Sequence, residues 1–209
     1  MSNGDGQLSY HCAFSFPAVF LTMGKESWDK LGGLYKTLES DMQFKVRKCL
    51  AFSMHEVAKI MGPEDTEIHL IPTFDLFFTD VEEVKIGVIS NLVSFISVLS
   101  ERKRLEFLSY FSVIQKENAK WRNRRLISKQ IFHLVDLYSP KKVFEIIYPI
   151  SFALVNDTFN SVRKKAFKGV KKFFYFYIYF YFYFFLLFLQ FFIYNFFFFL
   201  VCENNSIIF

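Results

Sequence analysis

Cysteine is scarce in this 209-residue chain, and its spacing excludes two common ways of stabilising a small domain. The three cysteines, Cys12, Cys49 and Cys202, are too few and too far apart for a disulfide framework or a zinc-binding pair. The first six residues, Met-Ser-Asn-Gly-Asp-Gly, are polar and lack the apolar core of a secretory signal. Reduced thiols without a signal peptide indicate a cytoplasmic protein, with the nucleus as a second compartment.

The common catalytic motifs are also absent. The sequence has no Gly-rich phosphate loop, no nucleophile elbow, no His-Glu-x-x-His and no Cys-x-x-Cys. Its four histidines are scattered, and we expect His55 and His133 to make polar contacts or face solvent rather than bind a metal. We therefore predict a protein that is not an enzyme, with no catalytic residue, no cofactor and no metal.

The charge is mildly basic, with acids interspersed among the lysines and arginines up to Lys172. A nucleic-acid-binding domain more often shows a concentrated basic stripe, so we expect protein partners and no nucleic acid.

What the chain does have is a repeat. A short acidic turn followed by a Val or Trp and a basic residue opens an apolar helix four times, with the anchors at Val46, Val84, Trp121 and Val162. The steps between the anchors are 38, 37 and 41 residues, and a period of this length with helical periodicity inside each unit is typical of HEAT or armadillo hairpins. The predicted fold is an all-α solenoid of about four repeats.

Apolar residues at helical spacing place the helices of each hairpin. The first hairpin is expected at residues 28–40 and 43–61, the second at 64–78 and 84–99, the third at 105–115 and 121–137, and the fourth at 143–154 and from about 159. Residues 10–23 suggest the last helix of a preceding repeat, kinked at Pro17. Pro72 and Pro149 each lie eight residues before an aspartate, and we expect them to bend the first helices of their hairpins.

The recurring acids and bases are predicted to be mainly structural. An aspartate at the turn can cap the next helix, and stacking places it beside the basic residue of a neighbouring unit. This interpretation covers Asp41, Arg47, Asp80, Lys85, Arg122, Asp157 and Arg163.

Two basic clusters are open to a second interpretation. Residues 102–104 and the run Arg122-Asn123-Arg124-Arg125 suit either a solvated surface or a positive rim that steers an acidic partner. Trp121 fits either the core or an interface anchor. The candidate partner-binding residues are therefore Trp121, Arg122, Arg124 and Arg125.

Several segments resemble one family, regulatory subunit 1 of protein phosphatase 4. They are Tyr10-His-Cys-Ala-Phe-Ser-Phe-Pro-Ala-Val, the run from Ser40 to Ala58, Asp80-Val-Glu-Glu-Val-Lys-Ile-Gly-Val, Leu137-Tyr-Ser-Pro and Ser161-Val-Arg. The likeness covers about residues 8–167. It implies a non-catalytic HEAT scaffold that binds the catalytic subunit of a type-2A-like serine/threonine phosphatase and regulates it. Members of the family are much longer, so the chain resembles an internal fragment. The alternatives are a generic HEAT adaptor for assembly or transport, and a membrane-anchored interaction protein.

The membrane alternative depends on the end of the chain. Between Phe173 and Cys202, 20 of 30 residues are Phe or Tyr. The segment is long enough to span a bilayer, but its Tyr residues alternate through it as in a strand instead of lying at the interfaces. The residue types are those of T- and A-rich codons, so we favour intron read-through or misprediction over a transmembrane helix. The predicted divisions are a polar, disordered segment at 1–7, the solenoid at 8–172 and this low-complexity tail at 173–209.

Overall fold

The structure is a computed structural model that describes residues 3–116, 120–170 and 190. These residues form the helices α1 (Asn3–Met23), α2 (Trp28–Glu39), α3 (Phe44–Met61), α4 (Pro63–His69), α5 (Ile71–Phe78), α6 (Glu82–Ser90), α7 (Leu92–Ile96), α8 (Glu101–Lys116), α9 (Trp121–Gln130), α10 (Pro140–Lys142) and α11 (Tyr148–Val155). The structure also has two 3-10 turns, η1 (Lys25–Ser27) and η2 (Ile131–Asp136), and one π turn, η3 (Val143–Ile147), among these residues. Residues 160–170 are also helical.

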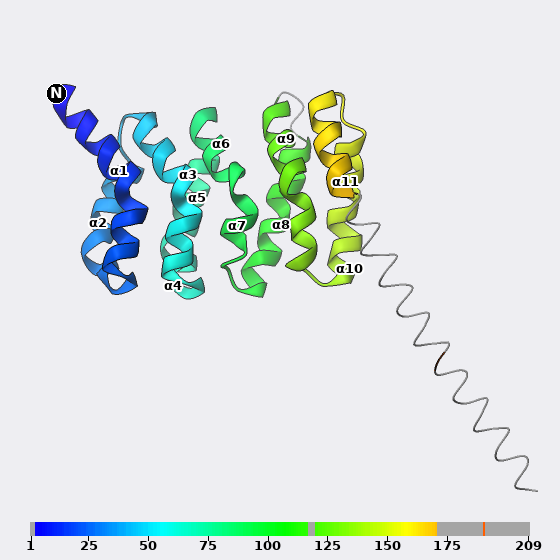
Figure 1. Ribbon diagram of the computed structural model, residues 1–209, viewed down its shortest axis with the longest axis horizontal. Coiled ribbons are helices and arrows are strands. Elements are labelled where there is room, and N and C mark those ends of the chain that lie inside the picture. Colours follow the sequence, from blue (N-terminus) through cyan, green and yellow to red (C-terminus); the bar gives the residue numbers. More distant parts are fainter. Residues whose placement is uncertain (1–2, 117–119, 171–189, 191–209) are drawn as a thin grey trace, which may run out of the picture.

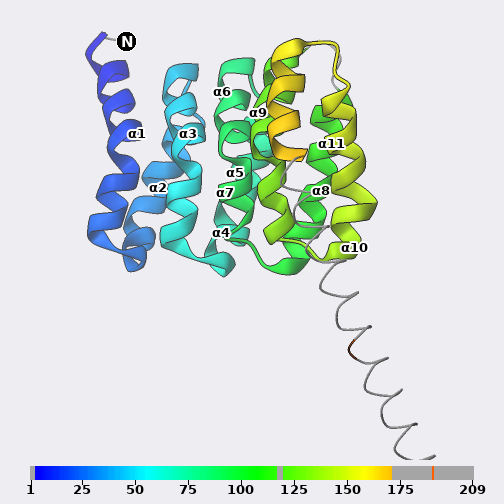
Figure 2. The ribbon, with the colours of Figure 1, turned by 45° about the vertical axis from the view of Figure 1, so that its right-hand side comes forward.

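The helices stack as hairpins in two layers (Figures 1 and 2). The first-helix layer consists of α2, α4–α5, α8 and α10–α11. The second-helix layer consists of α1, α3, α6–α7, α9–η2 and residues 160–170, and neighbouring members of it are in contact. The predicted all-α, HEAT-like array of about four hairpins is confirmed, and α1 takes the expected place of a second helix from a preceding repeat.

One apolar core runs between the layers. In α3, Val46, Leu50, Met54 and Val57 are buried at steps of three and four residues, so they share one face of the helix. Aromatic rings join successive first helices: the Phe74 ring lies 5.0 Å from that of Phe107. A buried apolar stripe on the longer helices is what drives hairpins of this kind to stack.

Glycine permits the sharp turn between the first two hairpins. Gly62 has φ 84, a left-handed conformation that favours glycine, and Pro63 starts the next helix at a position that requires no N–H donor. Gly87 is needed for another reason: a Cβ there would lie 2.7 Å from the Cβ of Ala51, so α3 and α6 approach too closely for a side chain.

The second helix of the second hairpin is interrupted, which is not predicted from the sequence. The second helix of the second hairpin ends at Ser90 and restarts at Leu92. Gln130 of the next hairpin bridges this break, because its amide donates to the carbonyl of Ile89 at 2.8 Å and accepts from the N–H of Val93 at 3.2 Å. The backbone groups at the break are thus satisfied by a neighbouring repeat.

The two prolines of the first helices lie at irregular points. Pro72 follows the junction of α4 and α5 at Leu70, and Pro149 follows the π turn η3. A proline removes one backbone donor, which accounts for the disturbed helix in both places.

The structure revises the repeat register in the third hairpin. The fully buried positions that open the second helices are Val46, Val84, Asn123 and Val162, with steps of 38, 39 and 39 residues. The prediction that Trp121 is the third anchor was wrong by two residues.

At the N-terminus, α1 begins at Asn3, so residues 3–7 are helical, whereas the sequence analysis expects disorder there. The predicted aromatic tail lies outside the described residues, apart from Gln190. Among the described residues, no helix is both long and apolar enough to cross a membrane.

Candidate partner-binding face

Ion pairs between successive hairpins hold the second-helix layer at the end where its helices begin. Arg47 donates from Nε and Nη2 to the two carboxylate oxygens of Asp80, at 2.7 and 2.8 Å. Arg124 pairs with Asp157 in the same way, at 2.5 and 3.2 Å. Both contacts join residues 33 apart. The predicted structural ladder is confirmed for these pairs, except that Arg124 takes the role assigned to Arg122.

The prediction that the aspartates cap the second helices was wrong, because neither α3 nor α6 has a side-chain hydrogen bond at its N-cap; the aspartates instead close the turns before the helices. The Asp41 carboxylate accepts the N–H of Gln43, and the Asp157 carboxylate accepts the N–H of Phe159, both at 2.8 Å. Hydrogen bonding from Arg47 holds the pKa of Asp80 below its usual range. The carboxylate therefore stays ionised at neutral pH, as a structural charge rather than a general acid.

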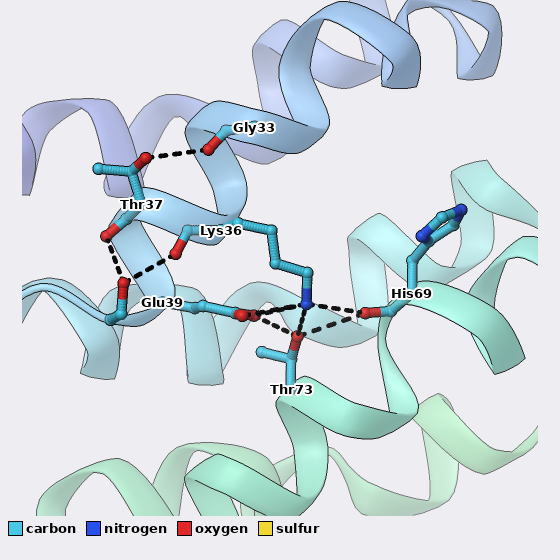
Figure 3. A network of polar contacts seen from close by, with 7 residues as sticks. Gly33, Lys36, Thr37, Glu39, His69 and Thr73 are labelled. Atoms are coloured by element: carbon cyan, nitrogen blue, oxygen red, sulfur yellow. Dashed lines mark hydrogen bonds and ion pairs between the residues drawn. The ribbon is translucent and has the colours of Figure 1, made fainter.

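The first-helix layer is joined by a second polar network (Figure 3). Lys36 Nζ lies 3.0 Å from a carboxylate oxygen of Glu39, 3.2 Å from the Thr73 hydroxyl and 3.4 Å from the His69 carbonyl. The Thr73 hydroxyl in turn donates to Glu39. The lysine and the glutamate neutralise each other within α2, and their hydrogen bonds to Thr73 and the His69 carbonyl tie α2 to α4–α5.

A hollow lies on the second-helix layer where the N-terminal half of α1 meets α3, and the end of α2 contributes Thr37 and Ser40 to its lining. It is an open groove of about 1670 Å³. Its lining includes Tyr10 and Phe14 from α1, and Lys48 and Phe52 from α3. Small-molecule sites usually measure about 300–1,000 Å³, so the size favours a polypeptide as the occupant.

Two titratable groups in the groove are held neutral. Burial raises the pKa of the Cys49 thiol, so it lacks the thiolate character of a reactive cysteine. Burial also lowers the pKa of His55, although its Nε2 lies 2.8 Å from Glu56. The groove combines apolar rings with charges of both signs, from Lys45 and Lys48 and from Asp41, Glu56 and Glu83. Neither Cys49 nor His55 supplies an activated nucleophile.

The structure separates the four predicted partner-binding residues. Trp121 is half-buried and stacks on Phe159, with ring centroids 5.6 Å apart. Arg122 is exposed and lies over the Trp121 ring at 5.1 Å, and Arg125 is exposed as well. Arg124 is only 5% exposed and is engaged with Asp157. Trp121, Arg122 and Arg125 thus remain on the surface, while Arg124 supports the array beneath them.

Sequence reasoning missed the groove and the lysines of the later second helices. The groove forms only where α1 and α3 lie side by side, and no local sequence pattern predicts that contact. The basic residues of these helices do repeat in the sequence, but the incorrect register of the third hairpin concealed the repeat. Arg125 and Lys164 are 39 residues apart, and so are Lys129 and Lys168. No group of acidic, histidine or cysteine residues in the described part of the chain could hold a metal.

Comparison with known proteins gives one consistent match. Residues 12–114 match the family described as the protein phosphatase 4 regulatory subunit 1 middle domain. Serine/threonine-protein phosphatase 4 regulatory subunit 1 from Homo sapiens, Mus musculus and Rattus norvegicus is in each case 40% identical over 170 residues, which is 80% of this chain. The chain spans 18% of the length of these relatives.

Proposed function

Because the chain is a relative of protein phosphatase 4 regulatory subunit 1, with that family's middle domain at residues 12–114, we propose that it is a regulatory subunit of a serine/threonine phosphatase. It binds a type-2A-like catalytic subunit and positions it, and the catalytic chemistry belongs to that partner. The observation that carries the proposal is the 40% identity over 80% of the chain, on a fold whose repeats commonly form binding surfaces.

We place the principal contact in the groove between α1 and α3. It is wide enough for a polypeptide, and most of its lining falls within the matched middle domain. Exposed aromatic residues such as Phe14 and Phe52 supply apolar contact, and Lys48 supplies charge. Interfaces often combine aromatic anchors with a polar rim in this way.

The surface at Trp121, Arg122 and Arg125 is a second proposed contact, and Arg124 contributes by holding the neighbouring turn through Asp157. For the organisation of the chain, we propose one HEAT array over residues 8–172. For its location, we propose the cytoplasm, with the nucleus as a second compartment.

The test is co-purification of a co-expressed phosphatase 4 catalytic subunit with the full chain. The groove variant is K48E/F52D. Its matched control is K141E/F152D, which makes the same charge change at a lysine and a phenylalanine exposed on the first-helix layer. We expect the unmodified chain and the control to retain the catalytic subunit, and the groove variant to retain about tenfold less, since losing two interface contacts of this size costs about 1.4 kcal/mol or more.

Two results would contradict parts of the proposal. Equal retention by the groove variant and the control would move the contact away from the groove. A folded chain that retains no catalytic subunit at all would overturn the phosphatase assignment and favour a HEAT adaptor for other proteins.

A further inference from the structure

Two neighbouring second helices carry a concentration of exposed positive charge. Residues 120–135, which form α9 and most of η2, contain no Asp or Glu, and neither do residues 158–170. Four basic side chains are exposed on these helices besides Arg122: Arg125, Lys129, Lys164 and Lys168. The helices lie side by side: Gly169 packs against Phe132 so closely that a Cβ there would lie 3.1 Å from its ring.

The repeat arranges these four charges in two rows. Arg125 and Lys164 occupy equivalent positions 39 residues apart, and so do Lys129 and Lys168. Along each helix the charges are about 6 Å apart, from four residues at 1.5 Å each. Between adjacent packed helices the axes are about 8–10 Å apart. We call these four residues the cationic quartet.

The quartet is not neutralised within the array. Two lysines of other helices pair with an acid one turn away, Lys59 with Glu56 at 3.1 Å and the half-buried Lys103 with Glu106 at 2.8 Å. In the part of the chain that the structure describes, no ion pair involves a member of the quartet. Arg124, which is buried in α9, does form an ion pair, with the carboxylate of Asp157.

The quartet is also bounded. On α6, the exposed Glu83 occupies the position equivalent to Arg122, and Asp136 ends η2 on the other side. A continuous polyanion that ran along the second-helix layer would meet these acids. A short acidic segment would fit between them.

We propose that the cationic quartet binds an extended acidic peptide segment of a protein partner. In an extended chain, alternate side chains point the same way about 6.6–6.8 Å apart, which matches the step along each helix. The stacked Trp121 and Phe159 rings, at the end where these helices begin, offer an apolar contact beside the charges. The proposal deepens the proposed function by adding the chemistry of a partner, and the peptide-binding assay that tests it contains no phosphatase.

The test is fluorescence anisotropy of a synthetic eight-residue peptide of alternating Glu and Ser with the full chain in low salt. The variant is R125Q/K129Q/K168Q. The matched control, K30Q/R102Q/K141Q, removes the same net charge from exposed positions of first helices. Thermal unfolding of both proteins shows that they are folded.

We expect the quartet variant to bind at least about tenfold more weakly, because each exposed charge pair changes an equilibrium constant by about two- to fivefold. The affinity of the control for the peptide should stay within about twofold of that of the unmodified chain. A peptide with Gln in place of each Glu should not bind. Equal weakening by the control, or equal binding of the uncharged peptide, would overturn the proposal. Tighter binding of a single-stranded RNA of the same charge would overturn it too, in favour of a nucleic-acid surface.

Phosphatase retention by the same quartet variant separates this proposal from the proposed function. A variant that keeps the catalytic subunit and loses the peptide supports a distinct peptide surface. If the unmodified chain binds the peptide but no phosphatase, the quartet stands and the proposed function fails.

Discussion

Replacing Asn123 with valine should stabilise the protein, because asparagine stands at a buried position of α9 that valine fills in the other second helices. Asn123 is fully buried, and neither its Oδ1 nor its Nδ2 has a hydrogen-bond partner among the described residues. The three equivalent positions hold Val46, Val84 and Val162, all fully buried. The array therefore accepts valine at this depth and orientation.

The expected gain comes from removing an unsatisfied amide. A buried polar group without a partner costs about 1–3 kcal/mol. Valine and asparagine have similar helix propensities, so the backbone term is small. For a chain of this size, about 1 kcal/mol changes Tm by roughly 2–4 °C. We therefore expect N123V to raise Tm by roughly 2–12 °C.

The assay is thermal and urea unfolding of the full chain, followed by circular dichroism. N91V is the contrasting variant, because the Asn91 amide donates to the carbonyl of Phe52 at 3.1 Å and its loss should destabilise the protein. N160V, at an exposed position, should change little. A lower stability of N123V would refute the reasoning, since it would mean that the amide is satisfied in solution.

Three further predictions concern the contacts between hairpins. G87A should lose about 1–3 kcal/mol of unfolding free energy, because the new methyl group would overlap Ala51, and a larger loss for G87V than for G87A would confirm the steric cause. Q130L should lose about 1–3 kcal/mol in urea unfolding because it leaves two backbone groups at the α6–α7 break unpaired, and no loss would show that water satisfies them. Because Arg47 lowers the pKa of Asp80 in the folded state, this pair stabilises fully above the unfolded pKa of about 3.9, and its contribution is lost as the pH falls through the lower folded pKa. Urea midpoints between pH 2.5 and 6 should show this loss, and D80N should flatten it. An unchanged slope in D80N would contradict the assignment.

Much of the architecture could be predicted from the sequence because hairpin stacking follows from the local periodicity of apolar residues. The apolar stripe of α3 and the spacing of Asp80 from Arg47 each depend on a fixed helical geometry, so a helix pattern and a repeat length are enough to place them. The same reasoning predicted that these charges are structural.

The third hairpin shows where the pattern is insufficient. Trp121-Arg122 imitates the Val-Arg pair of the other units, while the true anchor is a buried asparagine that no hydrophobic pattern would select. Only the partner of Arg124, across 33 residues, reveals the correct register.

The candidate surfaces were harder still. The groove depends on how α1 and α3 diverge, which is set by packing rather than by the residues that line it. The cationic quartet follows from the corrected register, so the error at Trp121 concealed it.

Hydrogen–deuterium exchange of the full chain, with and without a purified phosphatase 4 catalytic subunit, tests the central claim most directly. If the second-helix layer holds the partner at the groove, the amides of the N-terminal half of α1 and of residues 41–55 should exchange more slowly in the complex. The first helices α5 and α8 should be unaffected. Protection confined to α5 and α8, or no protection at a saturating concentration of the catalytic subunit, would contradict the account.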